Sequence, residues 1–167
     1  ENNFTCLSNI GNARSNGGSI SNNSRFTNII NNNFTLNSNG SSGTGGSTIN
    51  GIHIQSGNNS TIEGNTISPT TNSTLKLQYG IYNQSDSIII RNNTITKGIL
   101  GIESNSNYSE ISRNIISNIQ GNGIRLNSGT NQTAYANRLS NIYDGTGIVV
   151  NAPNSKVYNN YIQTQGI

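Results

Sequence analysis

The 167-residue chain contains one cysteine, two prolines and few charged residues, which make up 9% of the sequence. A single cysteine, Cys6, excludes an intramolecular disulfide. With two prolines and six acids the chain is unlike disordered proteins, which are rich in Pro, Glu and Lys. The nine Lys and Arg residues are scattered, so we expect no nucleic-acid partner. No apolar run approaches membrane-spanning length, and none is expected to span a membrane.

The abundant residues are Asn, Ser, Gly and Thr, with Ile as the main apolar residue. Ile is β-branched and suits strands, whereas Asn and Gly suit turns. Only 30% of residues are apolar, which is little for a core between two layers of secondary structure. A solenoid needs less, because each narrow coil encloses only a thin column of side chains. The composition therefore favours an all-β repeat protein, with residues 1–167 as a single domain.

One pattern, apolar-x-x-Asn-x-apolar, recurs along the chain. It is well formed around six asparagines: Asn32, Asn65, Asn93, Asn114, Asn137 and Asn160. A weaker copy near the start has Cys6 in its first apolar position and Asn9 in its Asn position. By this alignment, Cys6 is expected to point inward above Ile29 as a small core residue.

A second pattern, Gly-Ile-x-apolar, is interleaved with the first. Its glycines are Gly51, Gly80, Gly101, Gly123 and Gly147, with a degraded copy at Gly18 and a partial one at Gly166. From each glycine to the next repeat asparagine the distance is 13 or 14 residues, whereas from each asparagine to the next glycine it varies from 6 to 19. One arc of the repeat thus has nearly constant length and the other tolerates insertions, which is typical of a coil with one variable turn.

The alternation within these patterns predicts how each coil is built. In Gly51-Ile52-His53-Ile54 the two isoleucines point inward and His53 points outward. A coil of about 22 residues would contribute one strand at Gly-Ile, a second ending at the asparagine and a third after it, giving about seven coils and three parallel sheets. Asn tolerates left-handed backbone angles in a tight bend. Stacked about 4.8 Å apart, the six asparagines would form an internal hydrogen-bonded ladder.

These motifs resemble those of the right-handed parallel β-helix superfamily, which has the pectin-lyase-like fold. The resemblance covers about residues 6–167 and implies a single-stranded, right-handed solenoid. The same scaffold is similar to that of pectate lyases, polygalacturonases, mannuronan epimerases, phage tailspikes and surface adhesins, so the resemblance is specific for fold and weak for function.

The resemblance also implies that the Gly-Ile strands carry any polysaccharide site on their outer face. Their outward position forms a row of five residues: His53, Tyr82, Glu103, Arg125 and Val149. The longest variable turns, about residues 36–50 and 68–79, are expected to wall the row near His53 and Tyr82. We expect carbohydrate binding by His53, Tyr82, Glu103 and Arg125.

The catalytic alternatives depend on the same row. Glycoside hydrolysis needs two carboxyl groups about 5–9.5 Å apart, and the row holds one acid, Glu103, with Asp144 a marginal partner. A lyase or epimerase could use His53 and Tyr82 as base and acid, with Arg125 holding a uronate carboxylate. However, His53 lies outside the Asp-Pro-His-Glu signature of mannuronan epimerases, and the clustered acids that bind calcium in pectate lyases are missing.

Several paired positions have structural explanations. Glu63 and Arg91 occupy the same position in successive coils and predict an exposed ion pair. Glu103 and Arg125 are stacked in the same way, which explains both residues without a ligand. Tyr135 and Tyr158 also share a position, as an aromatic pair that serves either as a sugar platform or for packing.

The function expected from the sequence is a non-catalytic β-helix module of tailspike or adhesin type, either carbohydrate-binding or structural, at the cell or virion surface. A polysaccharide lyase or uronate epimerase is the alternative. We expect no metal site, because Cys/His metal spacing and Gly-Gly-x-Gly-x-Asp repeats are absent, and no cofactor. Because Gly166-Ile167 begins another strand, the chain is expected to be part of a longer protein whose open end is covered by a capping segment or a second copy.

Overall fold

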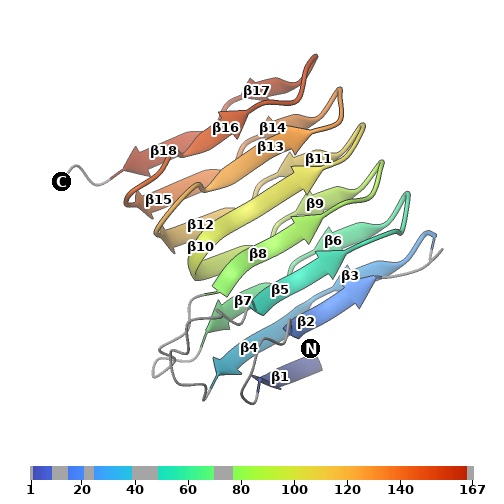
Figure 1. Ribbon diagram of the computed structural model, residues 1–167, viewed down its shortest axis with the longest axis vertical. Helices are drawn as coiled ribbons and strands as arrows, with labels where there is room; N and C mark the ends of the chain where they lie inside the picture. The colour runs from blue at the N-terminus through green and yellow to red at the C-terminus, as the bar shows by residue number, and fades with distance from the viewer. Residues whose placement is uncertain (1, 9–14, 21–24, 39–48, 70–76, 165–167) are drawn as a thin grey trace, which may run out of the picture.

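The computed structural model describes residues 2–8, 15–20, 25–38, 49–69 and 77–164. These residues form eighteen short β-strands and no helix. Every strand pairing is parallel and joins segments that lie about one coil apart in the sequence, such as Ile62 with Ile90. Figure 1 shows the strands rising tier by tier from the N-terminal to the C-terminal end. The molecule is therefore a solenoid of stacked coils, as the repeat predicts.

Three stacks of strands make up the solenoid, and each is named here by its place in the repeat. The Gly-Ile stack contains β2 (Ser15–Ile20), β5 (Ile49–Ile54), β8 (Leu77–Asn83), the second half of β10 (Thr94–Asn105), β13 (Ile124–Ser128) and β16 (Ile148–Val150). The pre-Asn stack contains β3 (Asn28–Ile30), β6 (Thr61–Glu63), β9 (Ile89–Arg91), β11 (Glu110–Ser112), β14 (Thr133–Tyr135) and β17 (Lys156–Tyr158). The post-Asn stack contains β1 (Asn2–Ser8), β4 (Asn32–Ser38), β7 (Thr66–Pro69), the first half of β10, β12 (Ile115–Ile119), β15 (Arg138–Ile142) and β18 (Tyr161–Thr164).

The predicted parallel β-helix is confirmed, with one detail that the repeat did not reveal. Strand β10 runs without interruption from the post-Asn stack into the Gly-Ile stack, so these two stacks form one twelve-stranded sheet beside the six-stranded pre-Asn sheet. The interval from Asn93 to Gly101 is short, and the chain turns between the two stacks at Lys97, which has φ 57°.

A column of isoleucines fills the interior. In β5 the side chains of Ile52 and Ile54 are fully buried while His53 between them is partly exposed, which is the alternation expected of a strand with one face inside. Register stacks like on like, as where Ile95 lies between Ile67 and Ile116. Each coil thus buries apolar surface mainly against its two neighbours, and stability accumulates coil by coil.

The recurring glycines allow the chain to bend closely around this column. At Gly101, an added Cβ would lie 2.7 Å from Cγ2 of Ile116 and closer still to the carbonyl oxygen of Gly123 in the next coil. The glycines at the same position in neighbouring coils are equally crowded by an inward side chain and by the next glycine carbonyl. The Gly-Ile motif therefore marks a close approach of backbone to core, and none of its glycines within the described residues has a positive φ.

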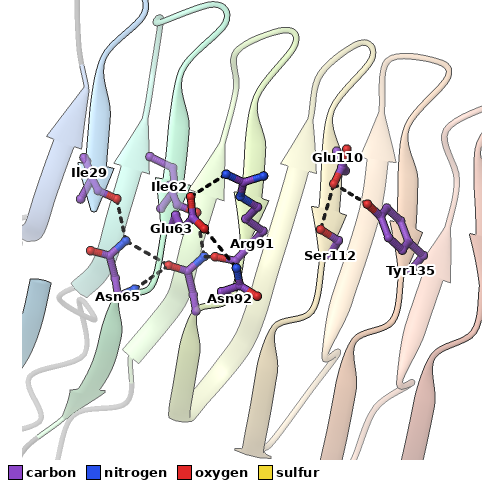
Figure 2. A network of polar contacts seen from close by, with 10 residues as sticks. Ile29, Ile62, Glu63, Asn65, Arg91, Asn92, Glu110, Ser112 and Tyr135 are labelled. Atoms are coloured by element: carbon purple, nitrogen blue, oxygen red, sulfur yellow. Dashed lines mark hydrogen bonds and ion pairs between the residues drawn. The ribbon is translucent and has the colours of Figure 1, made fainter. Parts of the chain in front are cut away.

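The asparagine ladder is confirmed. Oδ1 of Asn93 accepts from both the backbone N–H and the Nδ2 of Asn65, each 3.0 Å away, and Nδ2 of Asn93 donates in turn to Oδ1 of Asn114. Nδ2 of Asn65 also donates to the carbonyl of Ile29, as Figure 2 shows. The same arrangement runs through all six predicted members: Asn32, Asn65, Asn93, Asn114, Asn137 and Asn160.

At the corner that carries the asparagine ladder, the residue with a left-handed backbone is not the asparagine, as the sequence suggested. None of the six ladder asparagines, all of which are described, has a positive φ. The residue immediately before each one has φ between 53° and 66°: Asn31, Gly64, Asn92, Arg113, Ala136 and Asn159. The bend is made by the preceding residue, which frees the ladder asparagine to point inward and bond along the axis.

The predicted alignment of the first coil is wrong. Strand β1 pairs with β4 so that Asn2 and Phe4 lie beside Asn32 and Phe34, and Cys6 lies beside Leu36 rather than above Ile29. In the Gly-Ile stack, Gly18 pairs with Ile52, one position away from the expected glycine. The identical segments Asn-Asn-Phe-Thr at 2–5 and 32–35 carry the true register. The weaker match around Asn9 puts Gly11 in a position where the repeat calls for an apolar side chain, and both Asn9 and Gly11 lie outside the described residues.

Candidate functional site

The row of outward residues predicted on the Gly-Ile strands lies in register. His53 pairs with Tyr82, Tyr82 with Glu103, Glu103 with Arg125, and Arg125 with Val149. Adjacent members are therefore about 4.8 Å apart along the axis. The two turns expected to wall the row lie largely outside the described residues, so the site is defined by strand residues alone.

An aromatic cluster occupies the N-terminal half of the row. The rings of His53 and Tyr82 stack with centroids 5.2 Å apart, and Tyr79 stacks on Tyr82 at 4.7 Å. Nε2 of His53 lies 2.9 Å from Oε1 of the exposed Gln84, at hydrogen-bond distance. All three rings are partly exposed. The cluster presents π surface, hydroxyl groups and an amide together, which is the chemistry that a sugar ring and its hydroxyls require.

Tyr79 and Gln84 were missed by the sequence analysis. Tyr79 precedes Gly80 directly, and strict alternation along the strand would not place it on the same face as Tyr82. The structure nevertheless stacks the two rings on each other, beside a register irregularity where Ile49 and Asn50 pair with Leu77 and Tyr79. Gln84 follows the end of β8, beyond the motif that was matched.

An ion pair occupies the C-terminal half of the row. Nε of Arg125 donates to Oε2 of Glu103 at 2.8 Å, and Nη2 donates to the same oxygen. The other carboxylate oxygen, Oε1, accepts from Nδ2 of Asn105 at 3.0 Å. Glu103 is only 4% exposed, whereas the side chain of Arg125 is 29% exposed. The predicted stacking of these residues is confirmed, and both carboxylate oxygens have partners.

A buried polar cluster lies behind Tyr82 and Glu103. Asn83, fully buried, has its Nδ2 within 3.1–3.2 Å of the hydroxyl oxygens of Ser104, Ser106 and Ser109. Its Oδ1 accepts from the backbone N–H of Ser85. Satisfied polar networks of this kind hold the backbone in one arrangement, so the row is carried on a rigid support. The sequence contains a sign of this cluster: two Gly-Ile motifs end in a polar residue, Asn83 and Ser104, where the other motifs have an apolar one.

The remaining described carboxylates are engaged separately. Asp144, the proposed partner of Glu103, is exposed and contacts Gln120 through Oδ2 at 3.4 Å. Asp86 accepts from Asn107 on another corner of the coil. Glu110 accepts from Tyr135 at 2.7 Å. None of these contacts brings a second carboxyl group to Glu103.

The outer face of the pre-Asn stack carries the other predicted pairs, of which Figure 2 shows Glu63 with Arg91. Nη2 of Arg91 lies 2.8 Å from Oε2 of Glu63, and the guanidinium holds the pKa of that carboxyl below its ordinary value. Tyr135 and Tyr158 stack with centroids 5.0 Å apart and planes within 3°. Both pairs are confirmed. The ion pair is partly exposed at the surface, where such pairs contribute little to stability.

A polar hollow of about 290 Å³ lies at the ladder corner near the N-terminal end. It is lined by Asn31, Asn32, Asn33, Gly64 and Thr66. This corner joins the pre-Asn and post-Asn stacks and does not include the row.

The described residues contain neither a cluster of metal ligands nor a membrane-spanning helix. No group of three or more His, Cys, Asp or Glu side chains there could hold a metal ion. Within the same part of the chain, no helix is long and apolar enough to cross a membrane.

The comparison with protein families identifies the fold. Residues 50–167 match a family model described as a right-handed beta helix region. The chain belongs to this right-handed β-helix family. The handedness expected from the resemblance is thus supported by the match, and the description specifies a fold without a ligand or reaction. No curated protein and no solved structure matches the chain.

Proposed function

We propose that this right-handed β-helix domain is a non-catalytic carbohydrate-binding module, in which a glycan lies along the row of His53, Tyr82, Glu103 and Arg125. The proposal includes a setting like that of tailspikes or adhesins, at a cell or virion surface. The observation that carries it is the aromatic cluster of Tyr79, Tyr82 and His53, flanked by Gln84, on the outer face of a rigid stack.

The geometry offers an extended glycan what it needs. The row runs along the solenoid axis on regular strands, so its side chains are held without the ordering cost of a loop. Rings and amide lie at one end and the paired Glu103 and Arg125 at the other. A chain of sugars could therefore make a contact at each coil, about every 4.8 Å.

The geometry gives less support to a lyase or epimerase. His53 and Arg125 are three strands apart, or about 14 Å along the axis. A base and the group that neutralises the substrate carboxylate must act on neighbouring atoms of one sugar ring. In addition, the guanidinium of Arg125 is already engaged by Glu103. His53, Tyr82 and Arg125 are therefore better placed as contacts for successive sugars than as one catalytic centre.

The proposal is tested with a glycan array and two tyrosine variants. Tyr82→Ala removes the central ring of the cluster and should weaken glycan binding about tenfold, the effect of about 1.4 kcal/mol. Tyr108→Ala is the matched control, because Tyr108 is 66% exposed and lies outside the row. It should bind as the unchanged protein does.

Far-ultraviolet dichroism and thermal melting would verify that both variants fold. If no glycan binds, or if the two variants bind equally well, the row is not a carbohydrate site and the domain is better explained as a structural spacer.

A further inference from the structure

We infer that the glycan bound by this row is uncharged, and that Glu103 determines this specificity by occupying Arg125. This inference rests on the proposed function and concerns the same site. It follows from how the only two residues of opposite formal charge in the row, Glu103 and Arg125, are paired.

The carboxylate of Glu103 is buried and fully hydrogen-bonded. Glu103 is 4% exposed, and its two oxygens accept from Arg125 and from Asn105. A buried carboxylate with full hydrogen bonding is stable only while its cationic partner stays in place. The pair behaves as a neutral unit in the wall of the site.

The guanidinium of Arg125 is neutralised by Glu103. Arg125 is the group that would attract a uronate or another acidic sugar, since a guanidinium binds carboxylates through parallel hydrogen bonds. Two of its nitrogens are used on Oε2 of Glu103. An acidic glycan that approached the remaining N–H groups of Arg125 would meet a guanidinium whose charge is already neutralised, and it would place a second negative charge beside the carboxylate of Glu103.

The other side chains at the row are uncharged groups that suit neutral sugars. Tyr79, Tyr82 and Gln84 supply rings, hydroxyl groups and an amide, all of which suit neutral sugars. Selectivity against a competitor is commonly achieved by an unfavourable contact with it. Here that contact is the carboxylate of Glu103, so Glu103 acts as a specificity-determining residue.

The experiment compares neutral and acidic oligosaccharides of equal length on one array. The neutral set contains cello-, malto- and xylo-oligosaccharides, and the acidic set contains oligogalacturonate, oligomannuronate and oligoguluronate. The unchanged protein should bind members of the neutral set only. Glu103→Gln keeps the shape but frees Arg125, and it should raise affinity for uronates by about tenfold or more.

Two further variants are the controls. Glu110→Gln is the same substitution on the pre-Asn stack, where Glu110 accepts from Tyr135, and it should leave the preference for neutral sugars unchanged. The double variant Glu103→Gln with Arg125→Gln removes both charges and should also keep the neutral preference. If Glu103→Gln alone fails to fold, as judged by melting, the double variant and the unchanged protein still test the inference.

The outcomes separate the two proposals. Binding of uronates by the unchanged protein as tightly as neutral sugars would overturn the inference, as would folded Glu103→Gln with an unchanged preference. In both cases carbohydrate binding itself would stand. Absence of binding to every oligosaccharide of both sets would instead remove the proposed function.

Discussion

At the scale of single residues, the corner before each ladder asparagine sets a backbone requirement that residues meet unequally. Gly64 has φ 66°, a conformation that costs glycine nothing. Ala136 and Arg113 hold φ 53° at the same position in later coils. For a non-glycine residue the left-handed backbone conformation is roughly 1–2 kcal/mol less favourable than the right-handed one. The corner is thus strained in the coils that lack Gly or Asn.

This difference predicts opposite effects of two reciprocal substitutions. Gly64→Ala should lower the free energy of unfolding by about 1 kcal/mol or more. The alanine would have to adopt the left-handed backbone conformation, and its Cβ would collide with Oδ1 of Asn31. Ala136→Gly should raise it by about 0.5–1 kcal/mol. Urea unfolding followed by circular dichroism measures both. Changes of the same sign would contradict the assignment of strain to this corner.

At the scale of structural elements, the ladder links the corners of successive coils. Asn114 is fully buried, and its side chain makes four hydrogen bonds. Its Oδ1 accepts from the backbone and side chain of Asn93, and its Nδ2 donates to Ile90 and Asn137. Removal of the Asn114 side chain would therefore leave the hydrogen-bonding groups of Asn93 and Asn137, in the two adjacent coils, without this partner.

We therefore expect Asn114→Ala to lower the free energy of unfolding by about 3 kcal/mol, since buried donors and acceptors lose their partners without access to water. Asn28→Ala, at an exposed strand position, is the matched control and should change it by less than about 0.5 kcal/mol. Chemical denaturation with equal m-values measures the difference. A similar, small effect of both variants would mean that the ladder does not stabilise the stack.

At the scale of the whole molecule, each coil contacts only the coils before and after it. Ile90 and Ile111 in the middle of the solenoid are fully buried, whereas Val157 and Ile162 in the last described coil are 41% and 44% exposed. Strands β17 and β18 pair on one side only among the described residues. Covering of this face by a capping segment or a second copy stays a prediction.

Local opening should follow this gradient of burial. Native-state hydrogen exchange is expected to protect the amides of β9, β11 and β12 at least tenfold more than those of β17 and β18, because solenoids open from less buried coils. Mass spectrometry of peptides from these strands measures the ratio. Equal protection throughout would show that the chain opens only as one cooperative unit.

The local repeat was enough to predict the coil. An inward apolar residue at every second position and an asparagine 13 or 14 residues after each glycine specify the strands, the core column and the ladder, because these depend on alternation and on arc length. The row from His53 to Val149 followed from the same periodicity. Glu63–Arg91, Glu103–Arg125 and Tyr135–Tyr158 followed because like positions in successive coils must meet.

Only the tertiary structure decided what depends on where the chain bends. Tyr79 stacks on Tyr82 although strict alternation would place them on opposite faces, and the residue before each ladder asparagine, rather than the asparagine, takes the left-handed conformation. The first coil pairs in the register that sets Asn2 beside Asn32 and Phe4 beside Phe34, which the weaker match around Asn9 did not predict. A repeat specifies which residues recur, whereas bends and contacts across coils depend on how neighbouring coils pack.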